Sequence, residues 1–130
     1  MNSKVSVIIV SYNVKEYLDH AIDSLIRTSE NNLEIIVVDN NSFDGSVEHI
    51  KNLYPDVYVI ANEDNVGFGK AVNQAAKAAL GDYYLILNPD TVVQENTIST
   101  FVNYLEKNNN VGMVGPKILN SDGTLQAACK

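Results

Sequence analysis

Three polar residues of this 130-residue chain lie at or just beyond the ends of apolar runs of strand length. Asp39 closes the run LEIIVVD, and Asn88 and Asp90 follow YLIL in the segment NPD. Asn, Pro and Asp are common turn residues, so one reading of each segment is an ordinary turn. The alternative for Asp90 is binding of Mg2+, which takes one or two carboxylates together with waters and substrate phosphate oxygens. The alternative for Asp39 is a carboxylate that accepts hydrogen bonds from a nucleobase or ribose.

The segment NVGFGK, residues 65–70, places two glycines just before a helical pattern. It is either a flexible helix entry or a loop whose amides and Lys70 approach a phosphate at a helix N-terminus, where the dipole favours an anion. It lacks the Walker A spacing, and the turn SYNVKE after the first apolar run contains no glycine. The glycine fingerprint of a dinucleotide site is therefore missing, which argues against a nicotinamide or flavin dinucleotide.

The net charge of −7 argues against a nucleic-acid partner, because such binding depends on Lys and Arg that neutralise phosphates. A phosphate ester would then need backbone amides, local cations or a metal ion to hold it. No apolar run approaches the 18 or so residues that span a bilayer. The one cysteine, Cys129, cannot form an internal disulfide, which is consistent with a reducing compartment.

Strand-length apolar runs alternate with segments of helical period, the pattern of a mostly parallel α/β sheet in one domain. Strands are predicted at residues 5–10, 33–38, 57–61, 83–87 and 111–114. Apolar stripes predict helices around residues 14–25, 47–50, 68–79 and 98–105, and ILNSDGTL predicts a hairpin turn. Ser42 or Asp44 is expected to cap the second helix, and Gly81 to end the third as its C′ residue.

In open α/β sheets, ligands bind in the crevice outside the carboxyl ends of the strands. The polar segments after the predicted strands, among them Ser11 after the first, would meet at that edge, which collects Tyr12, Asn13, Asp39, Asn65, Asn88 and Asp90. Other candidates have simpler explanations: His20 and His49 fall in helical segments and are expected on the surface. No Cys and His spacing predicts a zinc site, and no serine elbow predicts a covalent nucleophile.

Five segments in this order and spacing resemble the inverting family-2 glycosyltransferases with the GT-A fold. They are VSVIIVSYN, LEIIVVDNNSFDGS, NVGFGKAVNQA, YLILNPDT and VGMVGPKILNSDGTLQ, and they cover nearly the whole chain. The NPD form and the final segment are most similar to the rhamnosyltransferase-type subgroup. The resemblance implies a GT-A, Rossmann-like three-layer sandwich in which residues 1–130 form the part that binds a nucleotide sugar.

The resemblance also implies roles for individual residues. The nucleotide would be bound by Ser11, Tyr12, Asn13, Asp39, Asn65, Gly67, Lys70 and Asn88. Within that set Asp39 would contact the nucleobase, the loop from Asn65 to Lys70 would close over the nucleotide, and Asn88 would contact the ribose or a water. Asp90 would bind Mg2+ or Mn2+. Asn88 stands where the family pattern has a carboxylate, which leaves one negative charge fewer for the cation.

The implied reaction transfers a sugar from a UDP- or dTDP-linked donor to a hydroxyl of a glycan or lipid-linked acceptor, with inversion, in cell-surface polysaccharide synthesis. The implied location is cytoplasmic, at most peripheral at the inner face of the membrane. In this family the general base lies in a later, acceptor-binding segment, and no residue of the chain matches it. The chain is therefore expected to be the donor-binding half, which binds nucleotide weakly and transfers little alone.

Two rival interpretations remain open from the sequence. A truncated, non-catalytic module would only dock nucleotides or another protein. A nucleotidyltransferase would use a related sheet and a metal ion, but it would normally carry a glycine-rich basic loop directly after the first strand. The segment SYNVKE does not supply such a loop.

Overall fold

The computed structural model describes residues 2–30 and 32–126, and Cys129 lies outside them. The described chain forms one parallel sheet with the strand order β3-β2-β1-β4. The strands are β1 (Val5–Ser11), β2 (Leu33–Asp39), β3 (Tyr58–Ala61) and β4 (Tyr83–Leu87). The helices are α1 (Lys15–Arg27), α2 (Ser46–Leu53), α3 (Phe68–Ala78) and α4 (Thr97–Lys107). The predicted α/β class is confirmed.

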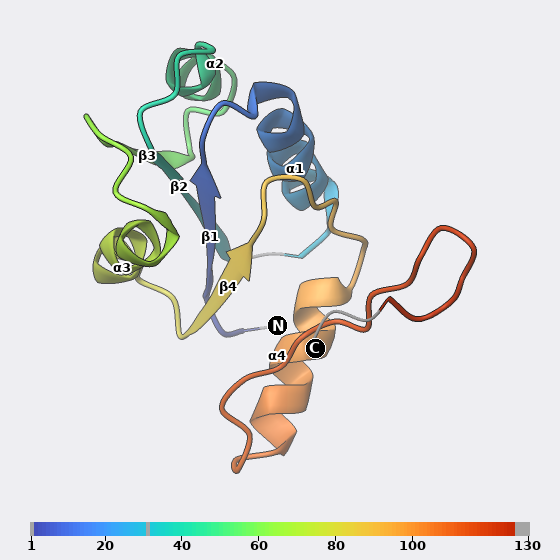
Figure 1. Cartoon of the computed structure of the whole chain (residues 1–130). Helices are drawn as coiled ribbons and strands as arrows, with labels where there is room; N and C mark the ends of the chain where they lie inside the picture. The colour runs from blue at the N-terminus through green and yellow to red at the C-terminus, as the bar shows by residue number, and fades with distance from the viewer. Residues whose placement is uncertain (1, 31, 127–130) are drawn as a thin grey trace.

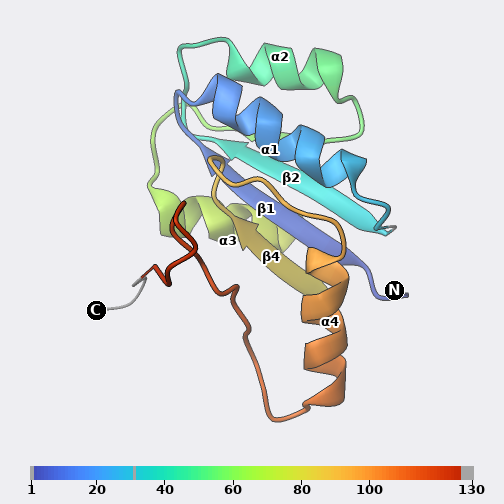
Figure 2. The same ribbon diagram turned by 90° about the vertical axis from the view of Figure 1, so that its right-hand side faces the viewer.

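The helices cover the two faces of the sheet unequally. Figure 2 shows α1 and α2 together over one face and α3 over the other, with α4 beside β4. All three strand pairs are parallel, so the carboxyl ends of the strands share one edge of the sheet (Figure 1). None of the helices among the described residues is both long and apolar enough to cross a bilayer.

Alternation along the strands divides the core between the two faces, because successive side chains of a strand point to opposite sides. Val7, Ile9 and Val37 pack in one cluster with Leu18 and Ile22 of α1. The other cluster pairs sheet residues with small helix residues: Ile8, Ile36, Val38, Ala71 and Ala75. The alanines of α3 let its backbone approach the sheet closely, as its alanine-rich sequence indicates.

The predicted fifth strand at residues 111–114 is wrong. This segment has no strand pairing, and the side chain of Met113 is 87% exposed. A strand needs a hydrogen-bonded neighbour, and within the described residues β4 pairs only with β1. The predicted hairpin turn is confirmed. Leu119 and Leu125 form an antiparallel bridge, and Gly123 takes the left-handed conformation (φ 86°) in the turn between them.

The residues predicted to begin α2 and to end α3 do not occupy the helix ends in the structure. The N-cap of α2 is Gly45 (φ 78°), so neither Ser42 nor Asp44 occupies the cap position. Asp44 Oδ1 nevertheless accepts a hydrogen bond from the first-turn amide of Ser46 (3.1 Å). Helix α3 ends at Ala78 with Ala79 as an extended C-cap, so Gly81 is not the C′ residue. Gly81 is instead packed against β1, where any Cβ would lie 2.5 Å from Ser6 Oγ.

A polar contact joins α1 to α2. Asp19 Oδ1 accepts a hydrogen bond from the Tyr54 hydroxyl (2.7 Å) and lies 3.1 Å from His49 Nε2. Burial, together with the Asp19 carboxylate, raises the pKa of Tyr54 to about 12. His20 is exposed and His49 half-buried, and their positions agree with the predicted surface placement.

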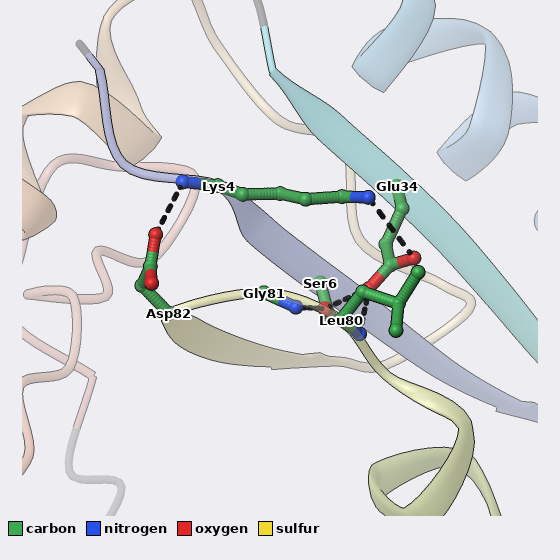
Figure 3. A network of polar contacts seen from close by, with 6 residues as sticks. All are labelled: Lys4, Ser6, Glu34, Leu80, Gly81 and Asp82. Atoms are coloured by element: carbon green, nitrogen blue, oxygen red, sulfur yellow. Dashed lines mark hydrogen bonds and ion pairs between the residues drawn. The ribbon is translucent and has the colours of Figure 1, made fainter.

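A second polar network holds the amino end of β4 against β1 and β2, at the opposite edge from the strand ends that carry the candidate site. Figure 3 shows Glu34 of β2 with its partners Lys4, Ser6 and Leu80. The Glu34 carboxylate accepts hydrogen bonds from the Ser6 hydroxyl and the Leu80 amide, and Lys4 Nζ lies 3.6 Å from it. The Ser6 hydroxyl in turn accepts from the Gly81 amide (2.8 Å). One carboxylate therefore ties three strands together.

Glu34→Ala is expected to lower the free energy of unfolding by about 1–3 kcal/mol at neutral pH, because it leaves the Ser6 and Leu80 donors without their charged acceptor. Burial acts to raise the pKa of the Glu34 carboxyl, but the hydrogen bonds from Ser6 and Leu80 and the charge of Lys4 outweigh it and hold that pKa below the ordinary 4.5. The stabilisation is thus present above pH 4.5 and is lost as the pH falls through the lowered pKa.

Urea unfolding at neutral and acidic pH measures this difference. The difference in the free energy of unfolding between wild type and Glu34→Ala should become smaller in acid. Glu63→Ala, at an exposed position, should unfold with the same free energy as wild type at both pH values. An equal gap at both pH values would show that the Glu34 charge is not what stabilises the network.

Candidate functional site

The carboxyl ends of β1 and β2 bring Ser11 and Asp39 side by side. They are register partners, and the Asn40 amide donates to the Ser11 carbonyl (2.9 Å). Ser11 is 1% exposed and Asp39 is 2% exposed. The Ser11 hydroxyl is buried without a hydrogen-bond partner among the described residues. Since buried polar groups are normally paired, a water or another partner is expected at this hydroxyl.

Asp39 organises the loop that follows β2. Its Oδ2 accepts from the Ser42 amide (2.8 Å) and its Oδ1 from the Ser42 hydroxyl (2.6 Å). The same hydroxyl accepts from the Asn13 amide (2.9 Å), and Asn13 Oδ1 accepts from the Phe43 amide (2.7 Å). Both carboxylate oxygens of Asp39 are thus engaged within the protein, and the loops after β1 and β2 are hydrogen-bonded to each other.

Asp44 adds a second connection between these loops. Its Oδ2 accepts from the Lys15 amide at the start of α1 (3.0 Å), and its Oδ1 accepts from Ser46. Burial acts to raise the pKa of the Asp44 carboxyl, but the Ser46 hydroxyl and the Lys15 and Ser46 amides outweigh it and lower that pKa. The carboxylate form is therefore the one that fits this position.

Two aromatic rings stand where these loops meet. The ring centroids of Tyr12 and Phe43 are 6.3 Å apart, with an interplanar angle of 75°, an edge-to-face contact. Tyr12 is 45% exposed and Phe43 is 77% exposed. Phe43 was not among the residues predicted from the sequence. The feature that could have indicated it is a single aromatic residue within the otherwise polar loop NNSFDGS.

The loop before α3 is fixed by hydrogen bonds to its own residues and to β2. Asn65 Oδ1 accepts from the Gly67 amide (3.0 Å), and the Gly67 carbonyl accepts from Asn40 Nδ2 (3.3 Å). Gly67 has a φ of 83°, a conformation that favours glycine. Gly67 is the N-cap of α3 and provides no side-chain cap, so the first-turn amides stay available to an anion. Lys70 lies exposed in this turn.

A cluster of neutral amides supports that loop, and the sequence analysis missed it. Asn62 Nδ2 donates to Asn40 Oδ1 (3.0 Å) and to Gln74 Oε1 (2.8 Å), and Gln74 Nε2 donates to Asn62 Oδ1 (2.9 Å). Asn40 then reaches Gly67 as described. The ends of β2 and β3 are thereby joined to α3 without any charged group.

The segment after β4 forms a tight turn. The Thr91 amide donates to the Asn88 carbonyl (3.1 Å), so Pro89 and Asp90 occupy the two central positions. Asn88 and Asp90 are exposed, and Asp90 makes no hydrogen bond or ion pair within the described part of the chain. Leu87 is the register partner of Ile9, which places this turn beside the end of β1.

Within residues 2–30 and 32–126, no group of three or more His, Cys, Asp or Glu side chains is arranged to hold a metal ion. The donors present at the turn are one free carboxylate and one amide oxygen. They fit a hard cation that keeps waters and takes its other ligands from a diphosphate, as Mg2+ does. They do not fit a cage built from protein ligands alone.

The structure thus links Ser11, Asn13 and Asp39 through the loop contacts, and Asn65 and Gly67 through Asn40. At the same strand-end edge lie Tyr12, Lys70, Asn88 and Asp90, whose side chains make no hydrogen bond to that linked group within residues 2–30 and 32–126. Two pockets of the described surface lie elsewhere, one beside β4 and α4 and one near the amino end of β2. Neither includes any of the predicted site residues.

Comparison with known proteins identifies a family. The model of glycosyl transferase family 2 matches residues 6–128. A glycosyltransferase of Haemophilus influenzae is 34% identical over 114 residues, which cover 85% of this chain and 35% of that protein. The minor teichoic acid biosynthesis protein GgaB of Bacillus subtilis is also 34% identical, over 84% of this chain and 13% of its own length. The chain therefore spans about a third or less of these relatives.

Solved structures show the same fold. The mannosyltransferase PcManGT from Pyrobaculum calidifontis, in complex with GDP-Man and Mn2+, matches 81% of this chain and 33% of its own at 25% identity, with a TM-score of 0.72. S. aureus TarS 1-349, in complex with UDP-GlcNAc, matches 91% of this chain and 38% of its own at 23% identity, with a TM-score of 0.74. The fold is thus GT-A, and the chain belongs to glycosyl transferase family 2.

Proposed function

We propose that this chain binds the nucleotide-diphosphate sugar of a glycosyltransferase at the carboxyl edge of its sheet. The observation that carries the proposal is the exposed Asp90 carboxylate, which has no partner in the described chain and sits in a turn beside the end of β1. An exposed turn tolerates a carboxylate without loss of stability, so the fold alone does not require one there. A divalent cation that bridges a diphosphate does require a protein carboxylate as a ligand. The Mn2+ and GDP-Man held by PcManGT support this interpretation.

The remaining roles follow from position. The uncapped first turn of α3 and Lys70 face the edge where a diphosphate would lie, and the dipole of α3 favours its charge. Ser11 would offer a hydroxyl that has no partner among the described residues, and Asn88 its exposed amide, to the ribose or a water. Asp39 would use the lone pairs left over from its bonds to Ser42 for the nucleobase. Tyr12 and Asn13, in the loop that follows β1, would line the nucleotide site.

Mg2+ or Mn2+, when bound at Asp90, would neutralise the charge that develops on the leaving diphosphate. The protein's own contribution at this site is to orient the donor and to hold its phosphates with fixed amides rather than mobile water. In the reaction we propose, a hydroxyl of the acceptor displaces the diphosphate directly, with inversion at the anomeric carbon. The general base is unassigned in this chain.

The acceptor we propose is a glycan or a lipid-linked glycan of the cell surface. The teichoic acid role in the name of the relative GgaB supports this class. We also propose a UDP- or dTDP-linked donor and membership of a rhamnosyltransferase-type subgroup. Both proposals rest on the resemblance of the NPD segment and of the GPKILNSDGTLQ tail to that subgroup. A cytoplasmic location, at most peripheral at the inner face of the membrane, stays a prediction from the sequence.

Calorimetric titration with UDP and with dTDP, each with and without Mn2+, tests the proposal. We expect weak binding that Mn2+ strengthens and little sugar transfer by the chain alone. Absence of binding to either nucleotide at millimolar concentration would sink the proposal. Rapid transfer by the chain alone would remove the alternative of a non-catalytic nucleotide-docking module.

A further inference from the structure

Three side-chain amides hold the start of α3, and the sequence predicted none of them as a site residue. We propose that Asn40, Asn62 and Gln74, the amide cluster, are positioning residues for the diphosphate of the donor. They act through the first turn of α3, whose uncapped amides and Lys70 would bind phosphate, and not by touching the ligand. This inference rests on the proposed function and adds to it the residues that set the geometry of its phosphate side.

The loop that enters α3 has little side-chain packing of its own. A Cβ added at Gly67 or at Gly69 would meet no other part of the described chain within 4 Å, and residues 63–65 and 67–70 are exposed. Between them, Val66 is half-buried against the core on the α3 side of the sheet. A glycine-containing loop can adopt many backbone conformations, so hydrogen bonds from neighbouring elements must fix this one.

Asn40 fixes the peptide from which α3 begins. It is 2% exposed, and its backbone amide donates to the Ser11 carbonyl (2.9 Å) at the end of β1. Its side-chain Nδ2 donates to the Gly67 carbonyl (3.3 Å). The same carbonyl accepts from the Ala71 amide (3.3 Å), which is the backbone hydrogen bond that begins the helix. The position of the first turn is therefore tied to the end of β1.

Asn62 and Gln74 tie the body of α3 to the ends of β2 and β3. Asn62 Nδ2 donates to Gln74 Oε1 (2.8 Å), and Gln74 Nε2 donates back to Asn62 Oδ1 (2.9 Å), so the two amides form a reciprocal pair. Asn62 Nδ2 also donates to Asn40 Oδ1 (3.0 Å), and the Asn62 backbone amide donates to the Asp39 carbonyl (2.9 Å). A shift of α3 along the sheet would break these directional bonds, whereas the apolar contacts of its alanines are not directional.

The amide cluster is neutral, which suits a phosphate site. A carboxylate at one of its positions could accept hydrogen bonds as well, but it would add negative charge beside a helix whose amino end favours an anion. Amides supply both donors and acceptors without that charge. The amide cluster thus fixes the first-turn amides in place before the ligand arrives and leaves their attraction for a diphosphate intact.

Gln74→Met and Asn62→Leu test the inference because each keeps the approximate shape of the side chain and removes its amide. Binding of pyrophosphate and of UDP, each measured by calorimetry with Mn2+, should weaken roughly tenfold, the equivalent of about one hydrogen bond. Binding of uridine, which has no phosphate, should change by less than about twofold when it is followed by ligand NMR. The double variant should bind no more weakly than the weaker single variant, because both changes remove one shared interaction. Gln74→Met leaves the bond from Asn62 to Asn40 in place, so it decides the question even if Asn62→Leu fails to fold.

Two control variants separate positioning from a general loss of stability. Asn103→Leu removes an exposed amide from α4 and should leave the affinity for pyrophosphate and for uridine unchanged. Tyr54→Phe removes the hydrogen bond to Asp19 that joins α1 to α2. It should lower the urea concentration at the midpoint of unfolding without weakening the binding of pyrophosphate.

A fluorescent reporter at the start of α3 gives an independent answer, because the chain contains no tryptophan. Phe68 is the first residue of α3 and is 55% exposed, so Phe68→Trp places a single indole there. Adding Gln74→Met should lower the fluorescence anisotropy of this indole, because the first turn then moves more freely. Adding Asn103→Leu should not change it.

The outcomes separate this inference from the proposed function. If Gln74→Met and Asn62→Leu bind pyrophosphate as tightly as wild type does, with unchanged anisotropy, the amide cluster only stabilises the fold, and the proposed function stands. If they weaken uridine and pyrophosphate alike, the amide cluster has no particular effect on the diphosphate, and the inference is wrong. If wild type binds neither nucleotide nor pyrophosphate, the proposed function fails and the inference fails with it.

Discussion

Asp90→Asn is expected to abolish the strengthening of UDP binding by Mn2+. The substitution keeps the size of the side chain and leaves the Asn88–Thr91 turn hydrogen bond untouched, because that bond joins backbone atoms. It removes the one exposed carboxylate of the turn. Residues that merely support a metal ligand already change metal affinity by about 10–100-fold, so loss of the ligand itself should cost at least about tenfold in Mn2+-dependent affinity.

Calorimetric titration of UDP with and without Mn2+ measures this effect. The affinity without metal should match that of wild type, and the free energy of unfolding should change by less than about 0.5 kcal/mol, because Asp90 is exposed. Asp56→Asn, which removes an exposed carboxylate at the far end of the sheet, is the control and should retain the full Mn2+ effect. Unchanged Mn2+ dependence in Asp90→Asn would place the cation elsewhere.

Asn88→Asp asks whether the amide in the NPD segment weakens the metal site. A second carboxylate two residues before Asp90 would add charge for the cation, so a metal-side role predicts tighter binding of UDP in the presence of Mn2+. An unchanged affinity would assign Asn88 to the sugar side of the donor and leave Asp90 alone with the metal.

The fold was predictable where a local pattern and a buried partner coincide. The central runs of β1 and β2, residues 7–10 and 35–38, are continuously apolar and pack on both faces of the sheet, and the stripes of α1 and α3 face the sheet. Residues 111–114 have a similar apolar composition, but no neighbouring strand pairs with them in the described chain. A run of apolar residues indicates that a segment could be buried in a strand. Whether a neighbouring strand is present to pair with it depends on the tertiary structure.

The location of the candidate site was predictable from the rule that parallel strands present their carboxyl ends at one edge, but its contacts were not. Asn40 looked like one more loop residue, yet it holds Gly67, 27 positions away. Asp39 was expected to face a ligand, and it is buried against Ser42. Glu34, within an apolar run, accepts from Leu80, 46 positions away. Such contacts depend on which loops meet, and no local periodicity encodes that.

Gly81→Ala is expected to destabilise the protein more than its single methyl group suggests. A Cβ at this position would lie 2.5 Å from Ser6 Oγ, 2.6 Å from the Ser6 backbone nitrogen and 3.0 Å from the Lys4 carbonyl oxygen. Two of these three atoms belong to the backbone of the β1 region, so rotation of a side chain cannot relieve the overlap. We expect the free energy of unfolding to fall by at least about 2 kcal/mol, as for an overpacked core, measured by urea unfolding.

Gly69→Ala is the matched control, since it makes the same chemical change in α3 where nothing lies within 4 Å of the added Cβ. It should be neutral or stabilising by up to about 1 kcal/mol, because alanine is the better helix former. Adding Ser6→Ala to Gly81→Ala removes one of the three overlaps but not the backbone nitrogen, so it should fail to restore stability. Full recovery in the double variant would show that only the hydroxyl was in the way. Because Ser6→Ala also loses the hydrogen bonds of that hydroxyl, the double variant is compared with Ser6→Ala alone. Destabilisation beyond that of Ser6→Ala would mean that the close approach of the two backbones fixes where β4 begins, and hence where its other end carries Asn88 and Asp90.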